Sequence, residues 1–235
     1  MRRLRIAAFV ALVPMVMALF GCCLDGPAYH GPVSDHFDGK RFHNEVDDMH
    51  AAGGLLKWMT HRKHGAWASH AGELPGPPPP ASVADSAMRV TFVNHSTVLL
   101  QTDGLNVLTD PIWSDRAGPY SWAGEKRKRP PGIRFEDLPK IDVVIISHNH
   151  YDHFDLPTLV RLAKRDHPRV FSGLGNAEYL RQHGVDANDL DWWQSVELRG
   201  GVTLTSVPAK HFSGRGAFDM ARTLWTGYVL QGPSG

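Results

Sequence analysis

The stretch 141–153 reads IDVVIISHNHYDH and joins an apolar run to a cluster of polar side chains. The apolar part, 141–146, is short and nearly all β-branched, which is typical of a strand buried on both faces. The polar part has the spacing H-x-H-x-D-H, so three imidazoles and one carboxylate fall within six residues, at the point where that strand should end. Nitrogen and carboxylate oxygen donors without sulfur suit Zn²⁺, with Mn²⁺ or Fe²⁺ as alternatives.

The spacing of the motif predicts two positions for metal ions. His148 and His150 are two residues apart, so on an extended segment both point the same way and can reach one cation. Asp152 and His153 follow where the chain leaves the strand, and a turn there can carry them to a second position. Two ions about 3.5–4 Å apart can hold a hydroxide between them and clamp both oxygens of an in-line displacement. The alternative is a polar loop in which histidines cluster by chance.

The rest of the chain predicts an α/β layered fold with mixed sheets. Asp103-Gly104 between two apolar runs indicates a tight hairpin, and Asp155 with Pro157 indicates the start of a helix. No internal repeat is visible. The predicted strands are 88–93, 97–101, 105–109, 141–147, 170–171, 192–198, 202–207 and 223–230, and the predicted helices are 156–165 and 177–183.

The motif, taken with several other segments, resembles the signature of the metallo-β-lactamase-fold hydrolases. Within that superfamily the chain is similar to the branch that contains N-acyl-phosphatidylethanolamine-hydrolysing phospholipase D and its bacterial relatives, and more distantly to the L-ascorbate-6-phosphate lactonase branch. The resemblance runs from about residue 89 to the end of the chain. The segments that carry it, besides the motif, are NHST at 94–97, LTDPIW at 108–113, RPPG at 129–132, DWW at 191–193 and PAKHF at 208–212.

The resemblance implies a four-layer αββα sandwich with a dinuclear metal site, most simply two Zn²⁺ ions, at one edge of the two sheets. It implies that His148, His150 and His211 bind the first metal, and that Asp152 and His153 bind the second metal and serve catalysis. Asp110 would orient the loop that holds the metals, although a plain turn carboxylate before Pro111 is the alternative. His95 either faces the site or packs within its own loop.

Two residues of the family site have no counterpart in the chain. The family has a bridging aspartate after the next pair of strands and a final histidine for the second metal. Only residues 231–235 follow the last predicted strand, and Asp219 comes too early for the bridging position. The chain is either a fragment of a longer protein or a short form with a degenerate site, and we favour the fragment. Either way we expect the 235 residues to bind metal weakly, chiefly through His148, His150 and His211, and to be poorly active.

The function that the resemblance implies is metal-dependent hydrolysis of phosphodiester bonds in phospholipid-like substrates. A metal-bound hydroxide would attack phosphorus, and no protein nucleophile is needed. Two alternatives stay open. One is a lactonase or esterase that uses the same metal site on a small ester, and the other is a non-catalytic metal-binding lipoprotein.

The first 22 residues are typical of a secretory signal rather than of a folded domain. A basic start, MRRLR, precedes an apolar stretch at 6–20 that is too short for a comfortable membrane span. The stretch ends in LFGC at 19–22, which resembles a bacterial lipobox in which Cys22 is lipidated. We therefore predict an exported lipoprotein anchored in the membrane and facing the periplasm or cell exterior. An ordinary cleaved signal or a signal anchor is the alternative.

The composition of the remainder sets further limits. Residues 23–85 are rich in histidine and proline, and we read them as a largely solvated segment and linker before a domain at 86–235. The only two cysteines, Cys22 and Cys23, leave the domain without disulfides or thiolate ligands. A net charge of +1 argues against nucleic-acid binding, and the basic run KRKR at 126–129 is either a solvated loop or a contact for phosphate headgroups. The oligomeric state has no signature in the sequence.

Overall fold

The predicted hairpin at Asp103-Gly104 is present and forms one side of the main sheet. Strands β2 (Thr97–Thr102) and β3 (Leu105–Thr109) pair antiparallel across it. Asp103 and Gly104 have φ angles of 49° and 71°. Positive φ at both turn residues matches the twist of the flanking strands, and an Asp-Gly pair tolerates it. The hairpin therefore follows from local chemistry.

The computed structural model describes residues 26–46, 61, 74–83, 87–216 and 218–233. The predicted signal peptide and lipobox, including Cys22 and Cys23, lie outside this part of the chain. Within it, no helix combines the length and the apolar character that crossing a bilayer requires.

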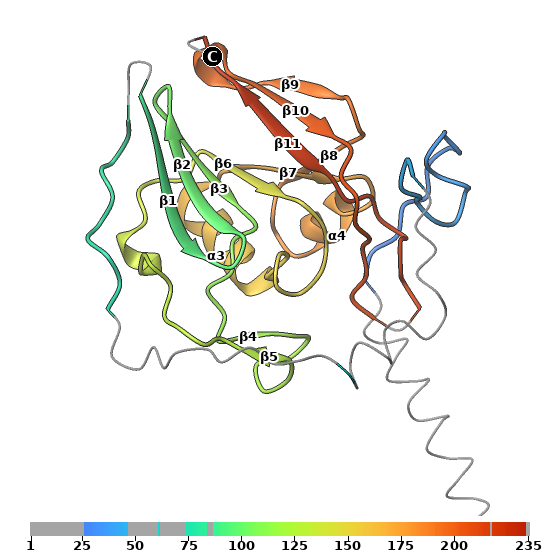
Figure 1. Cartoon of the computed structure of the whole chain (residues 1–235), viewed down its shortest axis with the longest axis horizontal. Helices are drawn as coiled ribbons and strands as arrows, with labels where there is room; N and C mark the ends of the chain where they lie inside the picture. Colours follow the sequence, from blue (N-terminus) through green and yellow to red (C-terminus); the bar gives the residue numbers. More distant parts are fainter. Residues whose placement is uncertain (1–25, 47–60, 62–73, 84–86, 217, 234–235) are drawn as a thin grey trace, which may run out of the picture.

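Six strands form the main sheet, and the apolar run of the motif supplies a central one (Figure 1). The first three strands are antiparallel neighbours, whereas the last four run parallel. The order across the sheet is β1 (Met88–Asn94), β2, β3, β6 (Val143–Ile146), β7 (Arg169–Gly173) and β8 (Ala187–Leu190).

Two helices cover one face of the main sheet. Leu159 and Leu162 of α3 (Leu156–Asp166) and Leu180 of α4 (Ala177–Gln182) share a buried cluster with Val144 and Ile146 of β6. All four residues of β6 are buried, as the sequence predicted for a strand covered on both sides. The helices hold the strand in place and thereby the loop that follows it.

A second sheet covers the opposite face. Its strands lie in the order β11 (Gly227–Gln231), β10 (Thr203–Val207) and β9 (Ser195–Glu197). Leu204 of β10 packs in a second cluster with Val143 and Ile145 of β6. The predicted α/β layered architecture is thus confirmed as helices, sheet and sheet. In the described residues, no helix lies on the outer face of the second sheet to complete the fourth layer of an αββα sandwich.

Four short elements connect these layers. A small hairpin pairs β4 (Arg116–Ala117) with β5 (Glu125–Lys126) and projects from the end of the molecule where β3 ends (Figure 1). Two 3₁₀ turns, η1 (Phe135–Asp137) and η2 (Arg199–Gly201), lie before β6 and β10.

Residues 26–46 are mostly exposed, as the sequence suggested, but two buried aromatic side chains fix the segment to the domain. Phe37 and Phe42 are each 2% exposed and form a third buried cluster with Trp192 and Trp225. His36 stacks on Trp192 at 4.5 Å between ring centroids. The sequence could not predict this packing, because the two tryptophan partners lie more than 140 residues away along the chain.

The proline-rich stretch is also tied to the domain. The amide of Gly76 donates to the carbonyl of Gly132 at 2.7 Å, and the side-chain amide of Gln101 donates to the carbonyl of Pro80 at 2.9 Å. The stretch is extended, as a polyproline run should be, but it lies along the domain and does not stand off as a spacer.

Three strand assignments need correction. The strand expected at 223–230 begins only at Gly227, as β11. The strand expected at 192–198 is only β9, Ser195–Glu197, because Trp193 has a φ of 67° that breaks the extended run. Strand β8, which contains Asn188 and Asp189, was not predicted. Its polar residues carry no strand signal, and only its pairing with β7 makes it extended.

Candidate metal centre

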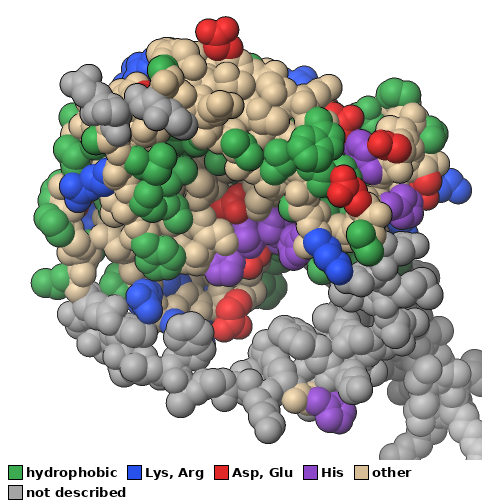
Figure 2. Space-filling model, turned by 45° about the horizontal axis from the view of Figure 1, so that its top comes forward, with side chains coloured by type: hydrophobic (Ala, Val, Ile, Leu, Met, Phe, Trp, Pro, Cys, Tyr) green, Lys and Arg blue, Asp and Glu red, His purple; other side chains and the backbone are tan. Residues whose placement is uncertain are grey.

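Two adjacent groups of side chains could each hold a metal ion. In each group, one ligand atom from every residue lies within 4.8 Å of the others. Figure 2 shows histidine side chains gathered on one surface of the molecule with carboxylates beside them. The first group is His148, His150 and His211, and the second is His95, Asp152 and His153.

The fold explains why these residues meet. Parallel strands β3 and β6 end at the same edge of the main sheet, so Asp110 after β3 lies beside Ser147 after β6. The motif then turns back on itself, since the amide of His153 donates to the carbonyl of His150 at 3.0 Å. His211 arrives from the end of β10 in the second sheet. The site therefore lies where the two sheets come together, as the resemblance implied.

The first group is spaced almost as a shared ion would require. His148 Nε2 lies 2.8 Å from His150 Nδ1 and 3.0 Å from His211 Nε2. Two nitrogens that bind one tetrahedral Zn²⁺ stand about 3.3 Å apart. A small outward movement of two rings would make the set fit one ion.

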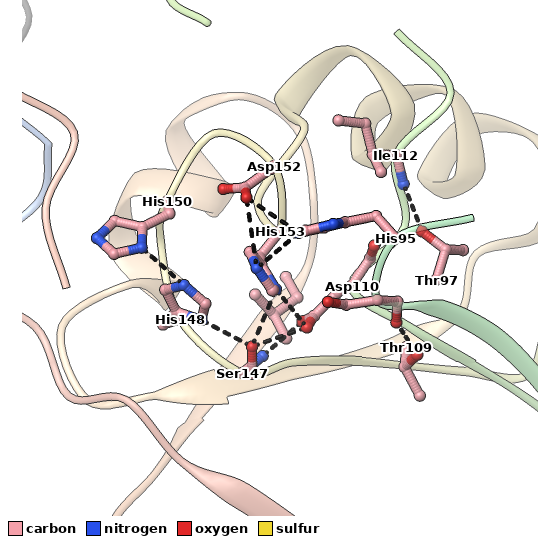
Figure 3. A network of polar contacts seen from close by, with 12 residues as sticks. His95, Thr97, Thr109, Asp110, Ile112, Ser147, His148, His150, Asp152 and His153 are labelled. Carbon is pink, nitrogen blue, oxygen red and sulfur yellow. Dashed lines mark hydrogen bonds and ion pairs between the residues drawn. The ribbon is translucent and has the colours of Figure 1, made fainter. Parts of the chain in front are cut away.

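The second group contains a residue whose role the sequence left open. His95 Nε2 lies 3.0 Å from Asp152 Oδ2 and 3.2 Å from His153 Nε2 (Figure 3). His153 Nε2 lies 3.7 Å from the same carboxylate oxygen. Of the two alternatives for His95, the structure therefore shows the one in which the ring faces the site. Its Nε2 is about as close to the Asp152 carboxylate as two ligands of one metal ion would be.

Asp110 contacts the backbone and side chains that orient both groups. Its Oδ1 accepts from the amide of Ser147 at 2.7 Å, and its Oδ2 accepts from the Ser147 hydroxyl at 2.7 Å and from His153 Nδ1 at 2.8 Å (Figure 3). Ser147 Oγ lies 2.8 Å from His148 Nδ1. Because the hydroxyl donates to Asp110, it accepts from Nδ1–H of His148. Both histidines thus carry a proton on Nδ1 and present the free lone pair of Nε2 to the site.

Three supports of the site were not singled out from the sequence. Ser147 is the first, although it stands inside the motif. Asn44 is the second, and it brackets His211 by accepting from its amide and donating to its carbonyl, each at 3.0 Å. Arg215 is the third, and it donates to the carbonyls of Asn149 and Phe154 at the two ends of the motif turn. For Asn44 and Arg215 no sequence signal exists, because each acts through backbone atoms that are distant along the chain.

Burial and neighbouring charges set the protonation of the site. Burial lowers the pKa of His148 to about 2 and that of His150 to about 4, and the surrounding imidazoles add to both shifts. Burial also lowers the pKa of His211. For Asp152, burial opposes ionisation, but the hydrogen bond from His95 and the electrostatic effect of the neighbouring His153 outweigh it and hold the pKa of the carboxyl below its usual range. The first group is therefore neutral and Asp152 is ionised near neutral pH, which are the states that bind cations.

Acid is expected to destabilise the metal-free protein well before its carboxylates are protonated. His148 and His150 bind protons in the unfolded chain near pH 6.5 but resist them in the folded protein. The unfolded state thus takes up protons first, and the free energy of unfolding falls as pH drops from about 6.5 to about 4. Urea unfolding of the metal-free protein across this range measures the effect. His148→Asn should flatten the dependence, whereas His183→Asn, at an exposed position, should leave it unchanged; a midpoint independent of pH contradicts the prediction.

A cavity of about 730 Å³ opens beside the two groups. His95, His150 and Asp152 form part of its wall, and Phe92 and Ile112 contribute apolar surface. The basic run Lys126 to Arg129, which is exposed except for Arg127, also lines it. A substrate in the cavity would meet metal-site residues, apolar side chains and cations together.

The residues present fit a pair of hard or borderline cations. Five imidazoles and one carboxylate make up the donor set, and sulfur is absent from it. In His148 and His153 the nitrogen away from the site is already hydrogen-bonded, which is the arrangement that metal-binding histidines have. The identity of the metal and its binding to these residues stay predictions.

The family model described as "Beta-lactamase superfamily domain" matches residues 105–235, more than half of the chain. Among curated proteins, an uncharacterized protein of Mycobacterium tuberculosis is 39% identical over 184 residues, which are 77% of this chain and 49% of the relative. N-acyl-phosphatidylethanolamine-hydrolyzing phospholipase D 1 of Caenorhabditis elegans is 36% identical over 160 residues, which are 63% of this chain and 45% of that protein. The chain thus spans about half the length of these relatives.

Among solved structures, the chain is similar to a possible metal-dependent hydrolase of Veillonella parvula, with 19% identity and a TM-score of 0.48 over 63% of this chain and 60% of that one. It is also similar to the metallo hydrolase Igni18 of Ignicoccus hospitalis, with 22% identity and a TM-score of 0.45 over 62% and 56% of the two chains.

Proposed function

The chain belongs to the beta-lactamase superfamily, and on this basis we propose that it is part of a metal-dependent hydrolase. The observation that carries the proposal is the pairing of two three-residue groups across one loop. His148 and His153, one from each group, are oriented by the same carboxylate, that of Asp110, the first through Ser147. One buried side chain thus orients a histidine of each group. Histidines that clustered by chance would not need such a shared partner.

We further propose that the bond hydrolysed is a phosphodiester in a phospholipid-like substrate. Two observations support this choice. One is the similarity to curated proteins described as N-acyl-phosphatidylethanolamine-hydrolyzing phospholipases D. The other is the cavity, whose wall combines apolar residues such as Phe92 with the cations of the basic run at 126–129. Anchoring through Cys22 in an exported lipoprotein belongs to the same proposal, because it would keep the site near lipid.

The residues of the chain supply binding, orientation and charge. When bound, the metals would activate a water molecule and polarise the bond to be broken. Asp110 and Ser147 hold the proton on Nδ1 of His148, so that Nε2 faces the first position. Asp152 adds negative charge at the second position, where its low pKa keeps it ionised. Phe92 and Ile112 in the wall of the cavity offer apolar surface to a substrate beside these charges.

Hydrolysis of bis-p-nitrophenyl phosphate and of N-acyl phosphatidylethanolamine, compared with lactone substrates, tests the proposal. We expect slow turnover of the phosphodiesters that depends on added Zn²⁺ or Mn²⁺ and falls to the metal-free background in Asp152→Ala. Asp186→Ala, an exposed carboxylate away from the site, is the matched control and should keep full activity.

The outcomes separate the alternatives. Turnover of lactones alone would favour the esterase reading. Metal bound at both groups without any turnover, in this chain and in a longer form that contains it, would identify a metal-binding protein instead. Zinc content measured by atomic emission in the same samples shows whether a loss of activity reflects a loss of metal.

A further inference from the structure

The β4–β5 hairpin carries an exposed aromatic pair at its tip. Tyr120 is 44% exposed and Trp122 is 75% exposed. Their rings stack at 5.3 Å between centroids and 5° between planes. The hairpin projects from the end of the molecule where β3 ends and belongs to neither main sheet (Figure 1). Two large aromatic rings that stack in solvent do not contribute to a core. Exposed apolar groups of this kind commonly mark a binding surface.

Positive charge gathers at the base of the same hairpin. Between Asp115 and Arg129 the sequence has five lysines and arginines against two acidic residues. Arg127 turns inward and donates to the carbonyls of Ile112 and Ser114. Lys128 pairs with Glu125 at 3.4 Å. Lys126 and Arg129 form no ion pair with any described residue, which leaves two cations for a ligand.

The hairpin and its cations lie close to the loop that carries the motif. Tyr120 lines a second cavity together with Tyr151 of the motif. Lys126 and Arg129 line the cavity whose wall also contains His95 and Asp152. Aromatic rings beside cations are the side chains that proteins place in the headgroup region of a bilayer, where the rings lie at the polar boundary and the cations meet phosphate. A surface with this composition at the entrance to a site suits a lipid layer better than a soluble ligand.

We propose that the β4–β5 hairpin docks on an anionic phospholipid surface. Tyr120 and Trp122 enter the headgroup region, and Lys126 and Arg129 contact lipid phosphates. Docking in this way turns the cavity toward the bilayer and presents a headgroup to the metal site. The inference deepens the proposed function, but docking does not depend on hydrolysis and can be measured without it.

Brominated lipid tests the position of the aromatic tip in the full chain. Vesicles of phosphatidylcholine with phosphatidylglycerol, made with brominated acyl chains, quench tryptophan that enters the bilayer. We expect the quenched fraction of the tryptophan emission to fall in Trp122→Phe. It should not fall in Trp193→Phe, which removes a tryptophan that is 68% exposed on another part of the surface. Because every variant keeps the same N-terminus, binding through that segment cancels in the comparison. Equal quenching in the two variants overturns the proposal.

Charge reversal tests the base of the hairpin. Lys126→Glu with Arg129→Glu should weaken binding to the anionic vesicles by at least about fivefold and leave binding to phosphatidylcholine alone unchanged. Lys140→Glu with Lys164→Glu, two exposed lysines elsewhere, is the matched pair and should have a smaller effect. Binding of a single-stranded oligonucleotide with equal affinity and equal sensitivity to the first pair would point to a nucleic-acid surface and overturn the proposal. Both vesicle measurements test docking even if no hydrolysis is observed, because neither depends on catalytic activity.

Discussion

Asp110→Asn is expected to weaken metal binding about 10- to 100-fold at both positions at once. The wild-type carboxylate accepts three hydrogen bonds, from the Ser147 amide, the Ser147 hydroxyl and His153 Nδ1. An amide has one oxygen and one NH₂ group, so the asparagine cannot accept all three and must place a donor against another donor. His148 and His153 then lose the partners that fix the proton on Nδ1. Isothermal titration with Zn²⁺ measures the affinity of each position.

A matched buried carboxylate separates this effect from a loss of stability. Asp189 accepts from the amides of Gly175 and Ala177 and from the Ser172 hydroxyl, and it has no contact with the candidate site. Asp189→Asn should therefore lower the free energy of unfolding while metal affinity stays at the wild-type value. If Asp110→Asn binds Zn²⁺ as tightly as the wild type, the orienting role of Asp110 is wrong. If only one position weakens, the coupling through Ser147 is wrong.

Phe37→Ala is expected to lower the free energy of unfolding by about 3–5 kcal/mol. The ring is 2% exposed, and it packs edge-on against Tyr29 at 5.0 Å and at a tilt against Phe42 at 4.6 Å between ring centroids. Its removal would leave a cavity in the cluster that joins residues 26–46 to Trp192 and Trp225. Urea unfolding, followed by tryptophan fluorescence, measures the change because both tryptophans report on this cluster.

The same substitution on the surface provides the comparison. Phe92 on β1 is 56% exposed, so Phe92→Ala should cost about 1 kcal/mol or less. A similarly small cost for Phe37→Ala would mean that residues 26–46 do not belong to the folded unit. A large cost would instead argue for keeping this segment whenever the domain is expressed, since Asn44 within it also holds His211.

The parts of the fold that local chemistry determines were predictable from the sequence. The Asp103-Gly104 turn, the buried strand β6 and helix α3 each have a signal within a few neighbouring residues. For α3 even the N-cap position is right, although the Asp155 side chain accepts from the amides of Trp113 and Ser114 and, within its own helix, from the Thr158 hydroxyl and not from a backbone amide. The motif likewise predicted that its histidines would converge, because a strand followed by a turn leaves them few other arrangements.

The parts that depend on distant contacts were not predictable. Asn44 supports His211 across 167 residues, and His36 bonds Asp191 across 155. Such pairs have no periodicity, and a single sequence cannot show that the two partners meet. His95 belongs to the same class, because a turn histidine looks identical whether it faces a metal site or solvent. Strand β8 was missed for a related reason, since its pairing with β7 outweighs the low strand propensity of its polar residues.

Two of the residues at the site sit on a left-handed backbone, His95 with a φ of 43° and Asp110 with a φ of 37°. This conformation costs a residue with a side chain about 1–2 kcal/mol, and glycine adopts it freely. A glycine at either position would therefore relax the backbone while removing an imidazole or a carboxylate from the centre. Variants selected only for higher thermal stability would therefore tend to lose His95 or Asp110. Engineering for stability should keep both residues unchanged.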